Sequence, residues 1–484
     1  MVFVILQHAA AFDGAKNILA CGVIRNLKIS NCVALENPEN QSTNASAGTD
    51  AVRIILAAGG TGGHIYPAIA IADDLKVLDP NAQILFIGLE NGMESTAVPT
   101  AGYSFEPIPA APSGRPFVSL YNLLVLPFVL AKSLIKSSQI LKEFKPDIVI
   151  GTGGFVSFPI CLAASLRGIK LVIQEQNSVP GIANQVLSLF SYKVFVAFNS
   201  SVDRFWQKSK CLVCGNPVRL SLRQYASKAV GRRHFFSNAV IGKGDGKVVL
   251  ILGGSLGANA INVAILHLYS EMLNERNDLF LIWQTGVLAY DEMESLVKFH
   301  PRLYITPFLH SMDLAYAAAD LIVSRAGAMI CSEILAAGKP CILIPSSDVA
   351  KGHQFHNACL MADFADSRVI TEDELDSLTL KNTIEEILGM VFCLPRVKQP
   401  LSLHVVVVRS AYTLPSPDPF WDFTGMNYCI NPPPNAPPSR TGVFADNEGL
   451  MREMSERALK IAKPNASVEI AKHVLSLVNS SIKL

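Results

Sequence analysis

Short apolar runs alternate with longer amphipathic segments from residue 52 to about residue 217. The apolar runs predict strands at residues 54–58, 84–88, 147–152, 171–174, 194–197 and 212–215. Because strands that alternate with helices pair in parallel within one sheet, this half of the chain is expected to form a doubly wound α/β domain.

A polar, basic stretch at residues 223–246 leads to a second half, in which the pattern begins again at residues 247–257. Further strands are predicted at residues 280–284, 303–307, 321–324, 341–345 and 369–370. We therefore expect two Rossmann-like domains that face a central cleft. Ligands of such sheets bind at the carboxyl ends of the strands, which carry residues 59–63, 151–154, 253–257 and 325–333.

The most informative motif is the glycine-rich turn after the first predicted strand. Glycines at positions 59, 60, 62 and 63 let the backbone approach a ligand, and the N–H groups of the following helix point at it. His64 lies at the mouth of this anion cradle. A dinucleotide fingerprint would need a third glycine where Ile65 stands, and Asp79 lies outside any matching strand end, so a nicotinamide cofactor is disfavoured.

Composition and charge narrow the classes of partner. The chain has 484 residues, of which 50% are hydrophobic and 17% charged, so it can bury a large core. A net charge of +1 without a long basic run argues against nucleic acid as a partner. The ten cysteines lie scattered, which fits a reducing compartment, and we interpret Cys211 and Cys214 as buried structural thiols instead of a metal or redox pair.

No metal and no other cofactor are expected. No D-x-D motif precedes a plausible sugar site, and Asp73 and Asp74 are interpreted as a solvated pair on a helix.

Both ends and one internal segment depart from the domain pattern. Residues 1–51 are interpreted as a leader, either an organelle transit peptide or disordered. Residues 52–219 form the first expected domain and residues 220–389 the second. Residues 390–446 carry proline clusters without periodicity, and we interpret them as a disordered insertion, from a translated intron or a gene-model error. Residues 447–484 are again helical, and their last helix is expected to pack on the first domain.

An ordered set of motifs carries a family resemblance. The motifs are residues 59–64 (GGTGGH), 145–154 (KPDIVIGTGG), 175–177 (EQN), 215–219 (GNPVR), 253–258 (GGSLGA), 324–340 and 352–358 (GHQFHNA). In this order they resemble glycosyltransferase family 28, over about residues 52–389 and the terminal helices. The resemblance implies a GT-B fold, in which two Rossmann-like doubly wound domains face a central cleft.

The resemblance also implies an activity, that of a UDP-N-acetylglucosamine-dependent hexosyltransferase. Members of this family transfer N-acetylglucosamine with inversion to the muramyl 4-hydroxyl of the undecaprenyl-pyrophosphate intermediate lipid I, which forms lipid II in peptidoglycan synthesis. Two alternatives stay open: a lipid glycosyltransferase with another acceptor, similar to a galactolipid synthase, and a catalytically dead sugar-nucleotide-binding scaffold.

The leader bears on localisation. Family members begin almost at the first strand, so a leader favours a plant or algal protein addressed to the plastid (chloroplast), where it would be peripheral on a membrane. The cytoplasmic face of a bacterial plasma membrane is the alternative.

For the first domain, the resemblance implies contacts with the acceptor and part of the donor. His64 is expected to act as the general base or to contact the acceptor pyrophosphate. Gly153 and Gly154 would form a second anion nest for that pyrophosphate. Asn177 resembles a sugar-contacting amide that Glu175 orients, although both could instead be buried structural residues. Backbone N–H groups of the glycine turn are expected to contact substrate at Thr61, Gly62 and Gly63.

For the second domain, the resemblance implies a UDP-binding site. Ser255 would donate its hydroxyl to a phosphate, and Arg219 would add positive charge. Leu309 is expected to contact uracil through its backbone and Gln354 to bind sugar hydroxyls. Glu333 would accept both ribose hydroxyls. The start of its helix is expected to present N–H groups to UDP at Ala328, Met329, Ile330, Cys331 and Ser332.

An apolar segment at residues 117–136 is flanked by Arg115 and by Lys132, Lys136 and Lys142. Given a polyprenyl-linked acceptor, we interpret it as a peripheral membrane contact through Leu124 and Phe128, with a core helix as the alternative. Polar residues and prolines interrupt this segment and residues 148–166, so neither predicts a membrane span.

Overall fold

The computed structural model describes residues 51–110, 124–223, 226–236, 246–347, 352–389 and 447–480. The expected leader up to residue 50 and the expected insertion at residues 390–446 lie outside this part of the chain. Residues Ala51–Leu484 cluster as one unit, which contains both sheets.

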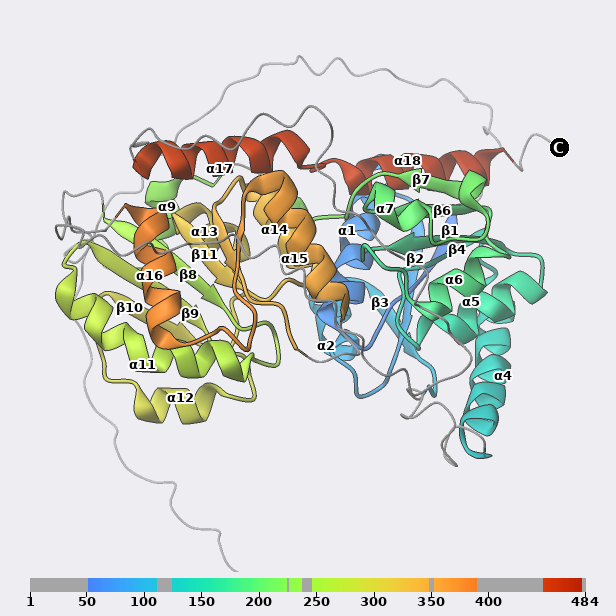
Figure 1. Ribbon diagram of the computed structural model, residues 1–484. Helices are drawn as coiled ribbons and strands as arrows, with labels where there is room; N and C mark the ends of the chain where they lie inside the picture. Colours follow the sequence, from blue (N-terminus) through green and yellow to red (C-terminus); the bar gives the residue numbers. More distant parts are fainter. Residues whose placement is uncertain are drawn as a thin grey trace, which may run out of the picture. The chain divides into compact units, whose positions relative to one another are not determined.

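The first domain is built on a parallel sheet. Its order among the described strands is β3-β2-β1-β4-β5-β6-β7, so the chain winds in one direction from β1 to β3 and then in the other from β4 (Figure 1). The strands are β1 (Arg53–Ala57), β2 (Gln83–Gly88), β3 (Ser104–Pro107), β4 (Ile148–Gly151), β5 (Lys170–Glu175), β6 (Lys193–Val196) and β7 (Cys211–Val213).

The second domain repeats this plan. Its parallel sheet has the order β10-β9-β8-β11-β12-β13. The strands are β8 (Lys247–Leu252), β9 (Leu279–Gln284), β10 (Leu303–Thr306), β11 (Leu321–Ser324), β12 (Cys341–Leu343) and β13 (Arg368–Val369). The expected fold class, two Rossmann-like doubly wound sheets, is confirmed.

Helices connect the strands and cover both faces of each sheet. In the first domain they are α1 (Gly62–Leu78), α2 (Glu94–Thr100), α4 (Leu126–Phe144), α5 (Ser157–Leu166), α6 (Ile182–Ser188) and α7 (Asn199–Val202), with a 3₁₀ turn at Lys208–Lys210. The second domain has α8 (Leu220–Arg223), α9 (Lys228–Phe235), α11 (Asn259–Glu275), α12 (Tyr290–Leu296), α13 (Met312–Ala318), α14 (Ala328–Ala337), α15 (Gly352–Ala365) and α16 (Ser377–Leu388).

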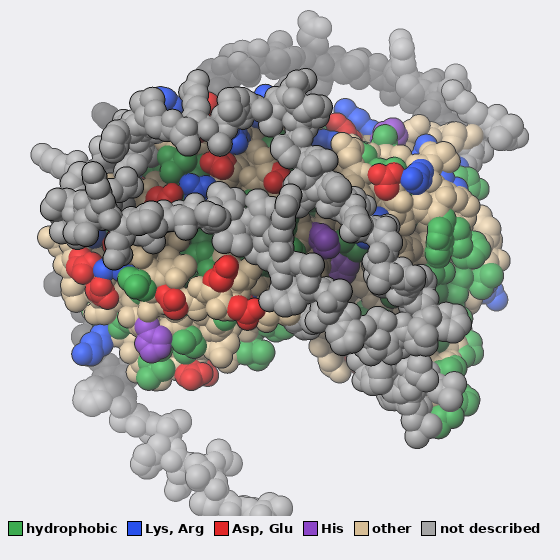
Figure 2. Space-filling view, in the orientation of Figure 1, with side chains coloured by type: hydrophobic (Ala, Val, Ile, Leu, Met, Phe, Trp, Pro, Cys, Tyr) green, Lys and Arg blue, Asp and Glu red, His purple; other side chains and the backbone are tan. Residues whose placement is uncertain are grey.

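Helix α4 exposes large hydrophobic side chains, and Figure 2 shows hydrophobic surface in the region of this helix. Leu124, just before the helix, is 52% exposed and Phe128 is 76% exposed. The helix packs inward through residues nearer its end, Ser133, Ser137, Ile140 and Leu141. Leu124 and Phe128 are therefore not core residues.

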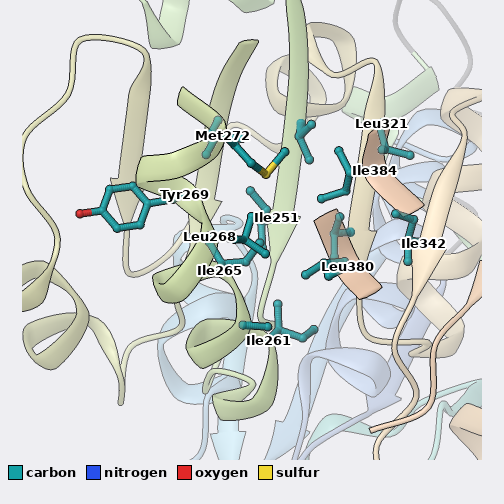
Figure 3. Packing of buried hydrophobic residues seen from close by; sticks show 14 of the residues in the cluster. Ile251, Ile261, Ile265, Leu268, Tyr269, Met272, Leu321, Ile342, Leu380 and Ile384 are labelled. Carbon is teal, nitrogen blue, oxygen red and sulfur yellow. The ribbon is translucent and has the colours of Figure 1, made fainter. Parts of the chain in front are cut away.

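Four hydrophobic clusters stabilise the sheets, one on each face. Figure 3 shows one of them, in which Ile251 of β8 packs between α11 and α16. Its α11 residues recur at helical spacing at Ile261, Ile265 and Leu268, as expected for one buried helix face.

The two C-terminal helices belong to different domains. Helix α17 (Asn447–Ile461) packs on α14, α15 and α16, and α18 (Ala466–Asn479) packs on α1 of the first domain. Ile470, Ala471 and Val474 of α18 are fully buried in the core of the first domain. The end of the chain thus completes a domain whose sheet begins near residue 53.

Two local expectations were wrong. Strand β3 was not predicted, because its sequence SFEP is polar and short and is held as an edge strand by pairing with β2.

Asp74 is only 3% exposed, so Asp73 and Asp74 are not a solvated pair. Helix α18 covers α1, and the Tyr103 hydroxyl donates to Asp73 Oδ1 at 2.6 Å. Burial, together with this hydrogen bond, raises the pKa of Tyr103.

Candidate active site

The predicted functional loops lie where the winding direction of each sheet reverses. In the first sheet this place is between β1 and β4, which are followed by the glycine turn and by residues 152–154. In the second sheet it is between β8 and β11, which are followed by residues 253–257 and 325–327. Such switch points open a crevice at the carboxyl ends of the strands, where α/β proteins bind ligands.

Residues from both sets of loops line a cavity of about 520 Å³. Thirteen of the predicted site positions line it, from the glycine turn of the first domain to the helix starts of the second. They are Thr61, Gly62, Gly63, His64, Asn177, Arg219, Ser255, Leu309, Ala328, Met329, Ile330, Glu333 and Gln354.

Other predicted site residues do not line this cavity. Cys331 is 1% exposed and packs in the core of the second domain, where burial raises the pKa of its thiol. Ser332 accepts a hydrogen bond from Asn216 Nδ2 at 2.9 Å and donates to the Ala328 carbonyl at 3.0 Å. Both positions face away because only part of a helix turn can face the ligand. Gly153 and Gly154 are also absent from the lining.

His64 is held from behind by two oxygen atoms. Its Nδ1 lies 3.0 Å from the Thr152 carbonyl oxygen and 3.1 Å from Gln176 Oε1. A carbonyl oxygen can only accept, so Nδ1 must carry a proton. In the neutral imidazole the other nitrogen, Nε2, then keeps its lone pair and can accept a proton from a substrate.

The glycines at 153 and 154 give the His64 ring its room. Both have positive φ, +102° and +83°. A Cβ at Gly153 would lie 2.9 Å from His64 Nδ1, and a Cβ at Gly154 would lie 2.3 Å from the Gly59 carbonyl oxygen. These positions therefore require glycine for backbone shape and close packing, whatever ligand the loop also contacts.

A buried carboxylate, which the sequence analysis missed, supports the glycine turn. Glu94 is 1% exposed at the start of α2, where its Oε1 accepts from the Leu89 N–H at 2.8 Å and its Oε2 from the Gly60 N–H at 3.4 Å. A Cβ at Gly59 would lie 2.4 Å from Glu94 Oε1. The turn thus needs glycine partly because a carboxylate packs beneath it.

Gln284 connects two loops of the second domain. Its Nε2 donates to the Gly254 carbonyl at 2.9 Å, and its Oε1 accepts from the Leu309 N–H at 3.0 Å. The N–H of Leu309 is therefore engaged within the protein. Val287 donates its N–H to the Ser255 carbonyl at 3.0 Å, which fixes the turn that carries the Ser255 hydroxyl.

Glu333 is 3% exposed and both its oxygens face protein groups. Oε1 lies 3.4 Å from Arg219 Nε, and Oε2 accepts from the Tyr316 hydroxyl at 2.9 Å. Burial and the Glu333 carboxylate raise the pKa of Tyr316, so its hydroxyl stays a donor. A ribose diol would share or replace these partners.

Asn177 is oriented by Glu175, which is itself 1% exposed. Glu175 Oε1 accepts from the Asn177 backbone N–H at 2.9 Å and from Asn177 Nδ2 at 3.0 Å. Its Oε2 accepts from Asn184 Nδ2 at 2.8 Å and from the Gly181 N–H at 3.1 Å. Glu175 thus fixes the orientation of the Asn177 side chain at the edge of the cavity.

Gln354 and His353 begin α15 at the edge of the cavity. Gln354 Oε1 accepts from the Ser346 N–H at 3.1 Å. His353 also lines the cavity, and burial lowers the pKa of its imidazole. Its Nδ1 is buried without a hydrogen-bond partner among the described residues. Sequence reasoning gave this histidine no role, although it stands in the quoted motif at residues 352–358.

The described residues form neither a metal-binding cluster nor a membrane-spanning helix. They hold no group of three or more His, Cys, Asp or Glu side chains placed to bind a metal ion. Cys214 is buried and Cys211 half-buried, both as free thiols, and burial raises the pKa of each. Every described helix is too short or too polar to span a bilayer.

Comparison with known proteins identifies the family. Residues 54–196 match the model of the glycosyltransferase family 28 N-terminal domain, and residues 248–390 match that of its C-terminal domain. The crystal structure of Acinetobacter baumannii MurG has a similar fold, with a TM-score of 0.57 and 23% sequence identity, over 88% of this chain and 99% of that chain.

Two curated relatives share one name, UDP-N-acetylglucosamine–N-acetylmuramyl-(pentapeptide) pyrophosphoryl-undecaprenol N-acetylglucosamine transferase. The relative from Salinibacter ruber is 41% identical over 70% of this chain and 89% of its own length. The relative from Christiangramia forsetii is 45% identical over 67% of this chain and 86% of its own length. The domain matches and these relatives show that the chain belongs to glycosyltransferase family 28, as its motifs predicted.

Proposed function

We propose that this chain transfers N-acetylglucosamine from UDP-N-acetylglucosamine to the muramyl 4-hydroxyl of lipid I, with inversion, and so forms lipid II. The proposal rests on one shared cavity. His64, whose Nε2 carries no proton in the neutral ring, lines it from the first domain, and strand-end loops of the kind that bind nucleotides line it from the second. The names of the relatives supply the substrate pair.

His64 acts as the general base in this proposal. Because Nδ1 carries the proton that bonds to Thr152 and Gln176, Nε2 is the nitrogen that takes the proton of the attacking 4-hydroxyl. The hydroxyl oxygen then forms the new bond at the anomeric carbon as the bond to UDP breaks. Backbone N–H groups of Thr61, Gly62 and Gly63 hold the substrates beside it.

The departing UDP is stabilised by the second domain. Helix α14 begins after Gly327, and its first residues, Ala328, Met329 and Ile330, line the cavity. The free N–H groups and the dipole at a helix start favour a diphosphate. Ser255 donates its hydroxyl to a phosphate, Arg219 adds charge, and Glu333 binds the ribose.

Contacts with the uracil, the sugar and the acceptor complete the proposal. The Leu309 carbonyl faces the base, and Gln354 and Asn177 bind sugar hydroxyls. Gly153 and Gly154 present N–H groups to the acceptor pyrophosphate beside His64. No described residue accepts a hydrogen bond from either of these N–H groups, which supports a ligand role beside the steric one.

Helix α4 supplies the membrane contact. The exposed Phe128 in this helix and Leu124 just before it belong to the same domain as the acceptor side of the cavity, which suits a lipid-linked substrate. The surface is either a plastid membrane or the cytoplasmic face of a bacterial plasma membrane. The plastid address depends on residues 1–51, almost all of them outside the described structure, and stays a prediction.

Radiolabel transfer tests this function. The full chain and a version without residues 390–446 are incubated with labelled UDP-N-acetylglucosamine and a water-soluble lipid I analogue. Transfer by either version supports the proposal. Transfer of labelled galactose from UDP-galactose to diacylglycerol instead would identify a galactolipid synthase. UDP binding without transfer to either acceptor would identify a binding-only scaffold.

A further inference from the structure

Behind His64 lies a row of buried side-chain amides that the proposed mechanism leaves unexplained. Gln174 lies near the end of β5, and Gln176 directly follows that strand. Asn216 lies in the loop after β7, the last strand of the first domain. Their side chains are at most 3% exposed. Burying an amide costs free energy unless its donors and acceptors are hydrogen-bonded, so the partners of these three side chains need to be identified.

The hydrogen bonds along this row all run in one direction. His64 Nδ1 donates to Gln176 Oε1 at 3.1 Å, and Gln176 Nε2 donates to Gln174 Oε1 at 2.6 Å. Gln174 Nε2 then donates to Asn216 Oδ1 at 3.3 Å. Each amide thus accepts through its oxygen from one neighbour and donates through its nitrogen to the next.

The row continues into the second domain. Asn216 Nδ2 donates to Ser332 Oγ at 2.9 Å, and the Ser332 hydroxyl donates to the Ala328 carbonyl at 3.0 Å. Asn216 Nδ2 also lies 3.0 Å from the Gln176 carbonyl oxygen. The last two members therefore belong to the first turns of α14, the helix proposed to hold the UDP diphosphate.

We propose that the amides of Gln176, Gln174 and Asn216 form a positioning relay that, together with the Thr152 carbonyl, holds the Nδ1–H tautomer of His64 and couples it to helix α14. The relay deepens the proposed function, because it rests on His64 as base and α14 as donor helix. A single amide could orient the ring, but only a row with one polarity links the protonated nitrogen to the other domain. When UDP binds at the start of α14, the resulting change in hydrogen bonding reaches His64 through Ser332 and Asn216.

Several charged groups surround the imidazole and must stay constant in any test. Arg219, Arg325, Glu333 and His353 line the same cavity. On the side of the sheet behind it, the carboxylates of Glu175 and Glu94 are held by their own donors. Substitutions within the relay leave all six in place, so a change at His64 reports the relay.

The tautomer is measured first, by ¹⁵N NMR of the histidine-labelled full chain, with His64→Gln to assign the signal. For neutral His64, the relay predicts the ¹⁵N chemical shift of a protonated nitrogen at Nδ1 and that of an unprotonated nitrogen at Nε2. A dominant Nε2–H tautomer, or an even mixture of the two, would overturn the relay. Transfer activity of the wild type, measured separately, tests the proposed function independently of this result.

Gln176→Glu then tests the link to chemistry. A carboxylate at this position favours the imidazolium, so the NMR titration midpoint of His64 and the acidic limb of the kcat/KM profile both move up by about one pH unit. Gln83→Glu adds the same charge at the exposed start of β2 and should move neither. An unmoved midpoint in folded Gln176→Glu contradicts the relay. A moved midpoint with an unmoved activity profile keeps the relay but removes His64 as the base.

Asn216→Asp tests the inter-domain end. The aspartate still accepts from Gln174 but cannot donate to Ser332. Saturating UDP should shift the His64 resonances of the wild-type protein and not those of Asn216→Asp, with UDP binding verified by calorimetry in both. Equal shifts in the two proteins, or no shift in the wild type, would show that α14 is not coupled to His64.

Discussion

The guanidinium of Arg219 lies over the ring of Tyr66, 3.9 Å from the ring centroid. Tyr66 belongs to α1, two residues after His64, and Arg219 closes the first domain. The Nε of the same arginine lies 3.4 Å from Glu333 Oε1 in α14. One side chain thus stacks on helix α1 of the first domain and pairs with a buried carboxylate of the second.

Replacement of Arg219 by alanine should weaken UDP binding. A charged hydrogen bond contributes about 1.5–3 kcal/mol, so the Kd for UDP should rise roughly 10- to 150-fold. Isothermal titration calorimetry measures this, with Arg457→Ala on the exposed face of α17 as the matched control. Equal affinity in the two variants would place Arg219 outside the nucleotide site.

A methyl group at Gly154 should disrupt the His64 loop, whereas one at Gly102 should not reach any neighbour. Both glycines have φ near +84°, but a Cβ at Gly154 meets the Gly59 carbonyl at 2.3 Å and one at Gly102 meets nothing within 4 Å. Gly102→Ala should cost about 1–2 kcal/mol for the left-handed backbone alone. Gly154→Ala should lower Tm further and reduce kcat. Equal melting temperatures would contradict the close packing.

Two aspartates at the start of α4 and just before it should release the protein from membranes. Leu124→Asp with Phe128→Asp places charges where exposed apolar groups would enter the lipid interface. Co-sedimentation with anionic liposomes should fall at least tenfold, with little change in Tm. Leu378→Asp, which alters a 65% exposed leucine of α16, is the control. Unchanged sedimentation of the double variant would assign membrane contact to another surface.

Lys339 should make the unfolding free energy depend on pH. Its Nζ donates to the Ala319 carbonyl at 2.7 Å, and burial lowers its pKa from 10.5 to about 8. Between these values the unfolded chain binds more protons than the folded one, so this residue's contribution to stability rises with pH.

The difference in unfolding free energy between wild type and Lys339→Met should therefore rise from pH 8 to pH 10, by at most about 1.4 kcal/mol per pH unit. Urea titrations at several pH values measure it. Parallel pH curves for the two proteins would mean that the ammonium stays charged in the folded state.

The sequence predicted both sheets because buried parallel strands are continuous apolar runs that stand out between helices. It failed at β3, where a polar edge strand carries no such signal. It also failed at Asp74, because helical periodicity cannot show that α18, some 400 residues later in the chain, covers α1.

The candidate site was predictable where glycine and charge patterns mark a strand end. Thirteen predicted positions line one cavity, and all of them except Leu309 come from the motifs. Cys331 and Ser332 do not line it, because the residues of one helix turn cannot all face a ligand. The relay was not predicted. Gln174 and Gln176 alternate along the end of β5, and two polar residues on a buried strand end could have signalled an internal network.

The role of His64 is tested most directly by comparing the wild type with His64→Gln in transfer and in UDP binding. The wild type should transfer N-acetylglucosamine to the lipid I analogue, and His64→Gln should lower kcat by about 10²- to 10⁴-fold, the usual contribution of a general base. The Kd for UDP should stay the same, because His64 has no contact with UDP in the proposed mechanism. Full transfer activity in His64→Gln, or no transfer by the wild type, would contradict this prediction.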